Sequence, residues 1–370
     1  MHLVQSAGYG VSIYVESLLT GLPRERYNQW LLGSEYYKTD TIKQIADGVD
    51  CIPMNRNISL LDLKAIVQCW IIIRKRKPDI LYCHSAKAGI YGRIACVGTG
   101  IKVVYNPHGW SFNMNCSWLK KMFYKTVETL FSIITDKIVA ISDYEFKTSP
   151  FLIPKWKIKE IPNGIDIEHC LNVLKNSSLK RKDVGIPEKA FVVGIIGRIS
   201  VQKGQDLFVK VAKQVIKEIP ESYFMMVGGK SDDIPIEDII ENLGLSDRII
   251  ITGEVNDAVR YATLFDVAVL TSRWEGFGLV LPEYMIAKKP VVAFNVDAVP
   301  EIVLDGETGI LVSEGDCKGM ADAIIDLFTN NKAAAMSQAG YVRAINKFTL
   351  ARVISEHDRL FTDLKSTGWE

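Results

Sequence analysis

Residues 271–283, which read Thr-Ser-Arg-Trp-Glu-Gly-Phe-Gly-Leu-Val-Leu-Pro-Glu, combine two carboxylates with a glycine-bearing turn. Gly276 and Gly278 let backbone N–H groups approach a ligand closely, and the helix expected to follow favours an anion at its N-terminus. Glu275 and Glu283 stand eight positions apart, where they could accept hydrogen bonds from two hydroxyl-bearing parts of one ligand. An ordinary turn between a strand and a helix has the same spacing, and by spacing alone that turn is the better interpretation.

A second turn, Gly197-Arg198-Ile-Ser-Val-Gln-Lys203-Gly204, places two cations beside glycines between an expected strand and an expected helix. Arginine binds anions as a bidentate fork and lysine as a point charge, a combination that suits a diphosphate. The turn is not a Walker P-loop, because G-x4-G-K-[ST] is absent. A solvated basic turn explains the same residues equally well.

Two histidines follow expected strands and therefore lie where such strands present ligand-binding groups. His108 stands in Pro-His-Gly-Trp after the run Lys102–Tyr105, and His84 follows the run Ile80–Cys83. A hydrogen-bonded structural role is the ordinary one for a single histidine. Two histidines at successive strand ends favour a functional role.

A third glycine turn, Gly8-Tyr9-Gly10, follows a very short apolar run at His2–Gln5. It lacks the complete G-x-G-x-x-G fingerprint of a dinucleotide site, so it does not support a nicotinamide cofactor.

These candidate residues all depend on an alternation of short apolar runs and longer amphipathic segments. The runs have the length and apolar character of parallel strands buried on both faces, and the alternation predicts doubly wound α/β folding. Besides the two named above, the expected strands are Lys137–Ile141, Phe191–Ile196, Ser222–Val227, Arg248–Ile251, Val267–Leu270 and Pro290–Phe294. The expected helices include Ser59–Arg76, Trp118–Ser132, Gly204–Glu218 and Gly319–Asn330.

The chain has 370 residues, which is about right for two domains. The pattern breaks at the polar segment 166–182, and Gly185-Ile186-Pro187 precedes the next strand. We therefore expect an N-terminal domain over 1–165, a linker over 166–185 and a C-terminal domain over 186–350, with a helix over 351–370 packing back on the first domain. Ligands would bind in a cleft lined by the carboxyl ends of the strands.

The net charge of +1 is the sum of two unequal halves. Residues 1–165 carry 21 Lys and Arg against 13 Asp and Glu, and residues 166–370 carry 23 against 30. A basic first half indicates an anionic surface or ligand. Nucleic acid is not the expected partner, because no RRM, helix-turn-helix or zinc signature accompanies the charge.

The seven cysteines are widely spaced and contain no C-x2-C pair, so they predict neither a disulfide framework nor a structural zinc site. Reduced, buried thiols are typical of a cytosolic protein. No apolar run approaches the roughly 18 residues of a membrane span, and the first residues do not resemble a signal peptide. We expect a cytoplasmic protein, with peripheral attachment to the inner face of the cell membrane as an option.

Taken together in order and spacing, these motifs resemble glycosyltransferase family 4, the retaining glycosyltransferases with the GT-B architecture. The resemblance runs over nearly the whole chain, and the combination of His84-Ser with Pro107-His-Gly-Trp-Ser-Phe112 is most similar to bacterial enzymes of capsule, lipopolysaccharide and other polysaccharide biosynthesis. It implies two Rossmann-like domains facing across a cleft. The further landmarks are Ile161-Pro-Asn-Gly-Ile-Asp166 and Pro300-Glu301 with Asp305-Gly306 and Gly309.

The resemblance also implies roles for single residues. Arg198 and Lys203 would neutralise the donor diphosphate as charge develops on the leaving group. Glu283 would accept from the ribose hydroxyls, Glu275 from hydroxyls of the transferred sugar, and His108 would hydrogen-bond that sugar near the reacting carbon. Backbone and neighbouring groups that would contact the donor are Gly8, Gly10, Gly197, Gly253, Glu254, Val255, Gly276, Phe277, Gly278 and Leu279.

The implied activity is transfer of a hexose from a nucleotide diphosphate sugar, with a UDP-sugar favoured over GDP-mannose, to a glycan acceptor. The resemblance implies retention at the anomeric carbon, and no metal or other cofactor is needed where Arg, Lys and a helix N-terminus supply positive charge. A sugar-nucleotide epimerase of the same architecture is the alternative. A non-catalytic glycan- or lipid-binding module is a third reading.

One departure from the family pattern concerns the acceptor side, where Asp297-Ala298-Val299 replaces the usual paired glycines.

The segment 110–125 mixes aromatic and basic residues as membrane-surface helices do. Together with the basic run 74–77, it favours an anionic membrane and a polyprenyl-diphosphate-linked acceptor. A core-facing helix with a solvated basic face is the alternative. The acceptor-side candidates are His84, Trp110, Phe112, Lys120 and Lys121.

Overall fold

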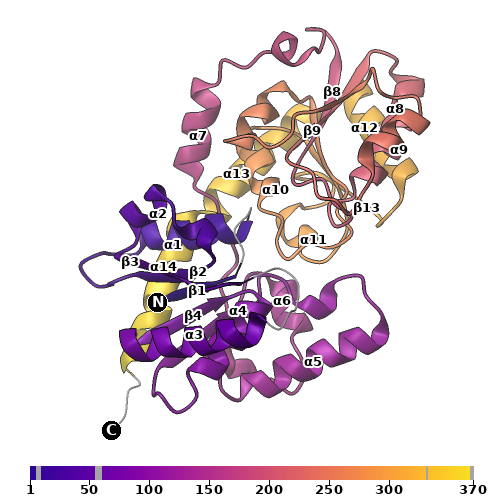
Figure 1. Cartoon of the computed structure of the whole chain (residues 1–370). Coiled ribbons are helices and arrows are strands. Elements are labelled where there is room, and N and C mark those ends of the chain that lie inside the picture. Colours follow the sequence, from indigo (N-terminus) through magenta and orange to yellow (C-terminus); the bar gives the residue numbers. More distant parts are fainter. Residues whose placement is uncertain (6–9, 55–60, 331, 367–370) are drawn as a thin grey trace. The chain divides into compact units, whose positions relative to one another are not determined.

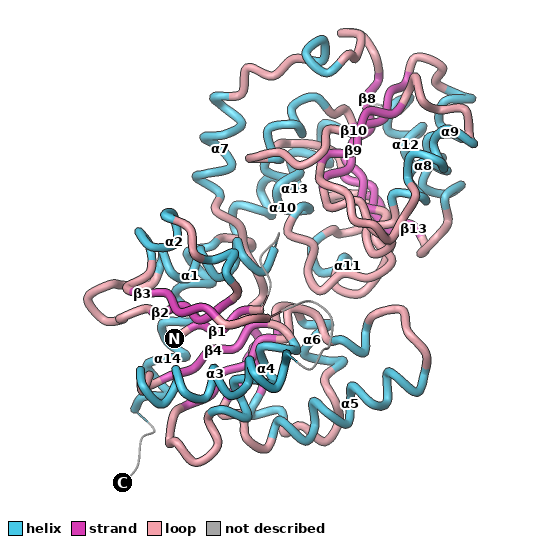
Figure 2. The backbone as a smooth tube through the Cα atoms, viewed as in Figure 1, coloured by secondary structure: helices cyan, strands magenta, loops and turns pink. Residues whose placement is uncertain are grey.

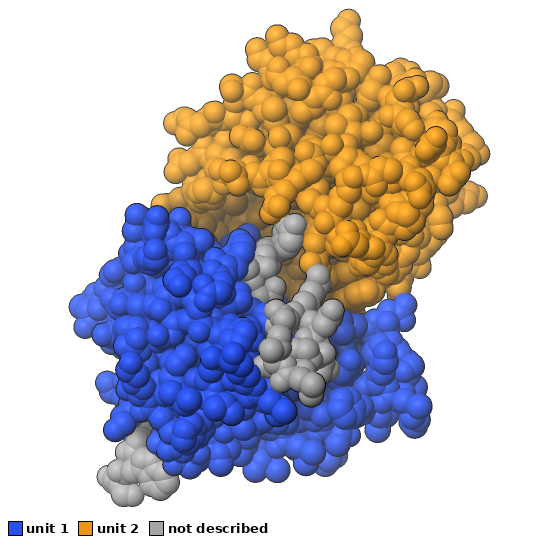
Figure 3. Space-filling model, viewed as in Figure 1, with its two compact units in different colours: residues 1–163, 350–370 blue, residues 164–349 orange. Residues whose placement is uncertain are grey.

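The computed structural model describes residues 1–5, 10–54, 61–330 and 332–366 (Figure 1). The chain divides into two compact units, one comprising residues 1–163 and 350–370 and the other residues 164–349 (Figure 3). The backbone thus leaves the first unit after Asn163 and returns to it after Thr349. The helix α14 (Leu350–Ser366) therefore belongs to the first unit although it lies at the far end of the sequence.

A parallel sheet of seven strands forms the centre of the first unit, in the order β3-β2-β1-β4-β5-β6-β7 (Figure 2). From β1 the chain first adds β2 and β3 on one side and then β4 to β7 on the other, so the strand order reverses at β1, which lies between β2 and β4. The strands are β1 (His2–Val4), β2 (Trp30–Gly33), β3 (Gly48–Cys51), β4 (Ile80–His84), β5 (Lys102–Asn106), β6 (Lys137–Ala140) and β7 (Ile158–Glu160).

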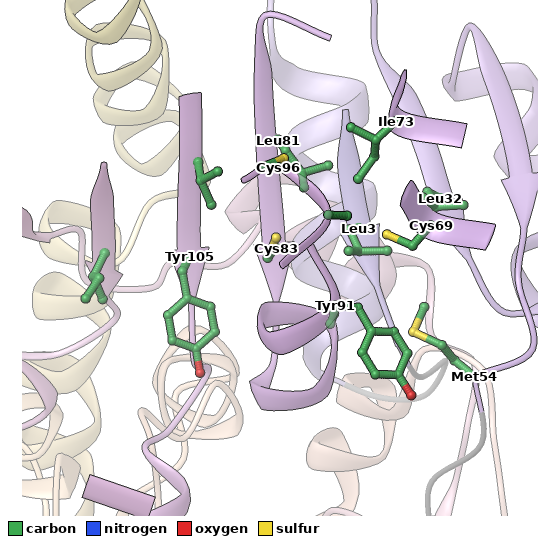
Figure 4. Packing of buried hydrophobic residues seen from close by; sticks show 14 of the residues in the cluster. Leu3, Leu32, Met54, Cys69, Ile73, Leu81, Cys83, Tyr91, Cys96 and Tyr105 are labelled. Atoms are coloured by element: carbon green, nitrogen blue, oxygen red, sulfur yellow. The ribbon is translucent and has the colours of Figure 1, made fainter. Parts of the chain in front are cut away.

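Helices pack on both faces of this sheet. One face, which includes Tyr82 and Val104, packs against α1 (Gly10–Gly21), α2 (Asp40–Ile45) and α14. The other, which includes Leu3, Cys83 and Tyr105, packs against α3 (Leu61–Arg76) and α4 (Ala86–Ala95), as Figure 4 shows. Successive strand residues point to opposite faces, which is why neighbours such as Tyr82 and Cys83 enter different cores. The unit also contains α5 (Trp118–Ser132) and α6 (Asp143–Thr148).

The second unit contains a six-stranded parallel sheet in the order β10-β9-β8-β11-β12-β13. Its strands are β8 (Phe191–Ile196), β9 (Ser222–Val227), β10 (Ile249–Ile251), β11 (Val267–Leu270), β12 (Val291–Phe294) and β13 (Ile310–Val312). Its helices are α7 (Ile167–Asn176), α8 (Gln205–Glu218), α9 (Ile236–Asn242), α10 (Val280–Ile286), α11 (Val299–Ile302), α12 (Cys317–Thr329) and α13 (Ala333–Lys347). The order reverses at β8, which lies between β9 and β11.

Two doubly wound parallel sheets confirm the predicted α/β fold class. The segment 166–185 differs from the expected linker, because it carries α7 and the 3₁₀ helix Arg181–Val184 and lies within the second unit. Asp166 begins α7 by accepting a hydrogen bond from the backbone N–H of His169 at 2.9 Å. The polar composition of this segment is that of an amphipathic helix whose buried side includes Cys170.

The reversal of strand order fixes where a ligand site can form in each unit. In open α/β sheets, the loops that leave neighbouring strands at the reversal diverge to opposite faces and open a crevice at the carboxyl ends. In the second unit these loops follow β8 and β11, and they contain residues 197–204 and 271–279. In the first unit the corresponding strands are β1 and β4, and β4 ends at His84.

Candidate active site

The loops after β8 and β11 pack directly against each other in the second unit. Gly204 has φ +69°, and a Cβ atom at this position would lie 2.2 Å from the carbonyl oxygen of Thr271. The Thr271 hydroxyl donates to the carbonyl oxygen of Lys203 at 3.0 Å. Glycine at 204 is therefore required both by the left-handed conformation and by the close approach of the two loops.

Lys203 and Glu275 form an ion pair that joins the two loops. The Glu275 side chain is 5% exposed and that of Lys203 is 21% exposed. The hydroxyl of Ser272 also donates to Oε1 of Glu275, at 2.7 Å. Both contacts use Oε1, and within the described part of the chain no group donates to Oε2. That oxygen is the part of the carboxylate available to a ligand hydroxyl.

The backbone of Glu275 is held by a residue that sequence reasoning noted only as a departure from the family pattern. Asp297, in the loop after β12, accepts a hydrogen bond from the Glu275 N–H at 2.8 Å. Asp297 has φ +45°, a conformation that aspartate adopts more readily than most residues. Its carboxylate thus fixes the backbone from which the Glu275 side chain extends.

Other polar residues of the same loops hold them in place and were not identified from the sequence. Arg273 binds Asp206 through two N–H···O contacts of 2.9 and 2.6 Å and also donates to the Val201 carbonyl oxygen at 2.7 Å. Buried Gln205 donates to the carbonyl oxygen of Arg198 at 3.1 Å. A charged residue after a strand is a weak signal, because the sequence alone does not identify Asp206, 67 positions away, as the partner of Arg273.

Glu283 lies on α10 and is partly buried. Burial raises the pKa of its carboxyl group to about 7, and the positive charge of Lys203 acts against this shift. Lys203 therefore acts on Glu283 through its charge and forms a direct ion pair with Glu275. The structure thus brings together the lysine and both glutamates that the sequence singled out.

The other predicted donor-site residues of the second unit lie on the same edge of the sheet. Gly197 (φ +153°) and partly buried Arg198 follow β8, and Gly253 (φ +73°) follows β10 beside exposed Glu254 and partly buried Val255. Gly276 is partly buried, Phe277 is buried against Phe348, Gly278 has φ +90°, and Leu279 immediately precedes α10. These positions remain predictions as ligand contacts.

In the first unit His108 and His84 are neighbours. Nε2 of His108 lies 3.0 Å from Nδ1 of His84, and Nε2 of His84 lies 3.2 Å from Nδ1 of His2. Burial lowers the pKa of His108 to about 3, so its ring is neutral at physiological pH. The expected glycine turn contributes Gly10 as the first residue of α1, whereas Gly8 lies outside the described residues.

Three of the acceptor-side candidates are buried and cannot present their side chains to an acceptor on the surface. His84 is completely buried, Trp110 donates through Nε1 to the Glu145 carbonyl oxygen at 2.8 Å, and Phe112 stacks on Trp110. Trp110 and Phe112 belong to the buried core that also contains Cys83 and Tyr105. Lys120 and Lys121 lie on α5, where Lys120 is exposed and Lys121 is partly buried.

The described residues contain no helix long and apolar enough to cross a bilayer and no cluster of three His, Cys, Asp or Glu side chains suited to a metal ion. All seven cysteines are free.

Comparisons with known proteins match this arrangement. Residues 9–169 match the model of the family described as Glycosyltransferase Family 4, and residues 176–343 match that of Glycosyl transferases group 1. The chain is 28% identical to the UDP-Gal:alpha-D-GlcNAc-diphosphoundecaprenol alpha-1,3-galactosyltransferase of Escherichia coli, over 93% of this chain and 91% of the relative. It is 27% identical to the capsular polysaccharide biosynthesis glycosyltransferase CapM of Staphylococcus aureus, over 84% of this chain and 83% of the relative.

A similar solved structure is that of HepE from Anabaena in complex with UDP and glucose. It superimposes with a TM-score of 0.83 at 21% identity, over 98% of this chain and 99% of that chain, and shows the same fold. The two family models cover most of the chain, and the relatives span nearly the same length. The chain is therefore an enzyme of the family-4-like glycosyltransferases of bacterial polysaccharide synthesis, with the GT-B fold.

Proposed function

We propose that this enzyme transfers a hexose, with retention and without a metal ion, from a UDP-sugar to a lipid-linked glycan. The observation that supports this most is the grouping of Lys203, Glu275 and Glu283 at the reversal point of the second sheet. There Lys203 and Glu275 stand on loops held by Gly204 and Asp297, and Glu283 lies on the helix α10 that follows. Such a set matches a ligand that carries both a diphosphate and several hydroxyl groups.

The leaving group is stabilised by cations. Lys203 and Arg198 lie on the loop after β8, where positive charge offsets the charge that develops on the departing diphosphate. Glu275 Oε2 accepts from a hydroxyl of the transferred sugar, and ionised Glu283 accepts from the ribose hydroxyls. A UDP donor is favoured because the E. coli relative is named as acting on UDP-Gal and the HepE structure contains UDP.

Retention is proposed to proceed on one face of the sugar. The bond between the anomeric carbon and the phosphate oxygen breaks, and the acceptor oxygen bonds to the anomeric carbon from the same side. The acceptor proton passes to the departing phosphate oxygen.

The acceptor is proposed to be held at an anionic membrane by α5. Three apolar side chains of this helix are largely exposed, Trp118 at 70%, Leu119 at 71% and Phe123 at 63%, and exposed Lys120 and Lys125 lie among them. An apolar surface interspersed with cations suits a bilayer that contains anionic lipids, and each cation contributes about 1 kcal/mol there. The diphosphoundecaprenol in the name of the E. coli relative supports a lipid-linked acceptor.

The direct test is a transfer assay with purified enzyme, a panel of UDP- and GDP-sugars, a polyprenyl-diphosphate-linked sugar and EDTA. We expect one UDP-hexose to be consumed with formation of a glycosylated lipid, whose α-anomeric linkage NMR would show when the donor is an α-linked sugar. Inversion of the linkage would contradict retention, and loss of activity in EDTA with recovery on adding Mg²⁺ would contradict metal independence. Conversion of the donor to an epimer without transfer would contradict the whole proposal.

A further inference from the structure

Four polar side chains of the first unit form one hydrogen-bonded network inside its core. They are buried and belong to Tyr14 on α1, Tyr82 on β4, Asn106 on β5 and His357 on α14. The Tyr14 hydroxyl lies 2.8 Å from Nε2 of His357 and 3.1 Å from the Tyr82 hydroxyl. The Tyr82 hydroxyl in turn lies 3.1 Å from Nε2 of His357 and 3.3 Å from Nδ2 of Asn106. These four residues, here called the buried network, bring together both ends and the middle of the first unit's sequence.

The two ends of the buried network are contacts with backbone groups, and these leave no choice of donor and acceptor. Nδ1 of His357 lies 2.7 Å from the carbonyl oxygen of Val353. Because a carbonyl oxygen only accepts, Nδ1 carries a proton and donates it. At the other end the backbone N–H of His108 only donates, and its acceptor at 2.8 Å is Oδ1 of Asn106. The Asn106 amide is therefore oriented with its nitrogen toward Tyr82.

Between these ends the hydrogen bonds run in one direction. Burial lowers the pKa of His357 to about 4, so its ring is neutral at physiological pH and Nε2 is an acceptor. Tyr14, whose hydroxyl is the nearer one, donates to Nε2. Tyr82 then donates to the Tyr14 oxygen and accepts from Nδ2 of Asn106. Each hydroxyl and the imidazole thus donates one hydrogen bond and accepts another, and a buried network satisfied in this way is rigid.

The buried network holds His108 in two ways. Asn106 accepts from its backbone N–H, which supports a φ of +52°, a left-handed conformation that costs free energy in a residue other than glycine. The ring of Tyr14 packs edge-on against the ring of His108, with centroids 4.8 Å apart and planes at 84°. The backbone and the ring of His108 therefore both contact residues that are linked to His357.

We propose that the buried network positions His108 for its contact with the transferred sugar, and that His357 on the C-terminal helix anchors it. Its members are positioning residues, because their side chains are buried and reach the ligand only through His108. A displaced His108 loses a hydrogen bond whose geometry decides how well the reacting sugar is held. The inference rests on the proposed function for the identity of the ligand as a sugar.

The first test concerns His357 and needs no substrate. The full chain, labelled with ¹⁵N in its five histidines, gives NMR spectra in which protonated and unprotonated ring nitrogens are distinct. Near pH 7 we expect His357 to be protonated at Nδ1 and unprotonated at Nε2. His357→Gln removes these signals and so assigns them. Protonation at Nε2 alone would overturn the role of His357 as the anchor.

The second test follows the backbone N–H of His108 by NMR hydrogen exchange. Tyr82→Phe keeps the ring but leaves Nδ2 of Asn106 without its acceptor, so the His108 amide should exchange severalfold faster relative to the amides of β5. Tyr105→Phe is the matched control, because it removes a buried tyrosine hydroxyl, bonded to Glu128, from the opposite face of the same sheet. It should leave the exchange rate of His108 unchanged. Equal exchange in wild type and Tyr82→Phe would overturn the inference.

A third test uses catalysis to show that the buried network acts through His108. Tyr82→Phe should lower kcat about tenfold in the wild type, leave the dissociation constant of UDP unchanged and cost nothing further in a His108→Ala background. Tyr105→Phe should leave kcat unchanged in both backgrounds. An equal loss from Tyr82→Phe in both backgrounds would show that the hydroxyl acts by another route, and would contradict the positioning role.

These results separate the inference from the proposed function. If His357 and the His108 amide behave as expected and the enzyme transfers no hexose, the proposed function fails and the support of His108 by the buried network stands. If hexose transfer is observed and the losses from Tyr82→Phe are equal in the two backgrounds, the proposed function stands and the inference fails.

Discussion

Lys203 and Glu275 are 72 positions apart in the sequence, and their side chains form an ion pair between the loops that follow β8 and β11. The glutamate is almost completely buried and the lysine is only partly exposed. The pair therefore joins the group proposed to neutralise the diphosphate to the group proposed to hold the sugar. Substitution of either residue therefore removes the ion-pair partner of the other.

Lys203→Ala should lower kcat by about 100-fold, the usual cost of removing one group that stabilises the transition-state charge. It should also lower the free energy of unfolding by about 1–3 kcal/mol, because Glu275 loses a charged partner in a buried place. Rates and denaturation curves check both effects. Lys210→Ala, on the exposed side of α8, is the matched control. The double variant Lys203→Ala/Glu275→Gln should be more stable than the sum of the single losses predicts, and strict additivity would contradict the coupling.

Glu283 should make donor binding depend on pH. Its carboxyl pKa is raised to about 7, and the ribose hydroxyls need the ionised acceptor. The dissociation constant of the donor, measured by calorimetry, should therefore decrease as the pH rises from 6 to 8. This dependence should be absent in Glu283→Gln and present in Glu237→Gln, a change at an exposed glutamate of the same unit. Equal pH dependence in all three proteins would exclude Glu283 as its source.

The same group should affect stability in the opposite direction. Between pH 4.5 and 7 the unfolded state ionises Glu283 while the folded state keeps it protonated, so the second unit loses stability as the pH rises through this range. Relative to the wild type, Glu283→Gln should gain about 1–3 kcal/mol above pH 7 and almost nothing at pH 4.5. Hydrogen exchange of peptides from α10 at several pH values measures this difference. A constant difference would contradict the raised pKa.

Asp297 should act through the position of Glu275. Asp297→Ala leaves the Glu275 N–H without its acceptor and should cost about 1–3 kcal/mol, with kcat reduced about tenfold. Asp297→Asn keeps an acceptor oxygen and should retain most of the stability and most of the kcat of the wild type. Asp297→Gly relieves the left-handed backbone but supplies no acceptor, so its activity should resemble that of the alanine variant. Full activity in Asp297→Ala would show that the hydrogen bond does not position Glu275.

Acid should destabilise the first unit before the second. Burial lowers the pKa values of His2, His84, His108 (to about 3) and His357 (to about 4), so below pH 6.5 the unfolded state binds protons that the folded state does not. Each such histidine contributes a loss of about 1.4 kcal/mol per pH unit. Hydrogen exchange between pH 7 and 5 should show that peptides of the first unit lose protection steeply as the pH falls. His357→Gln should reduce this slope, and His169→Gln, at an exposed histidine of the second unit, should not.

Binding to anionic vesicles tests the role of α5. Trp118→Ser/Phe123→Ser should weaken binding to vesicles that contain anionic lipid by at least tenfold, because two large exposed apolar side chains are lost. Flotation assays at low and high salt measure the effect. Phe328→Ser, at an exposed aromatic residue of the second unit, should bind as the wild type does. Unchanged flotation of the double α5 variant would rule out this surface.

The strands were predicted best where the chain is apolar throughout. Phe191–Ile196, Ser222–Val227 and Val267–Leu270 match β8, β9 and β11 in their bounds, because central strands of a parallel sheet are buried on both faces. β7 reads Ile-Lys-Glu and lies at the sheet edge, where burial imposes no such pattern. The sequence analysis predicts a linker where α7 lies, although Asp166 as its cap and apolar residues at 167, 170, 171 and 174 are a helical signal.

Site residues could be predicted from the sequence only where a continuous sequence motif identifies them. Lys203, Glu275 and Glu283 stand in motifs with glycines, and these can be read directly from the sequence. The role of Asp297 cannot, because it depends on a contact with the backbone of a residue 22 positions away. His84 was placed on the acceptor side, since the sequence shows that it follows a strand and not that the ring is enclosed between His2 and His108. Strand register, which sets that enclosure, arises only from the packed sheet.

The most direct test of the proposed donor site is a crystal structure of the enzyme bound to a non-hydrolysable UDP-hexose. We predict that the diphosphate lies within hydrogen-bonding distance of Arg198 and Lys203, with the ribose hydroxyls on Glu283 and a sugar hydroxyl on Oε2 of Glu275. A nucleotide bound away from the loops after β8 and β11 would contradict the account.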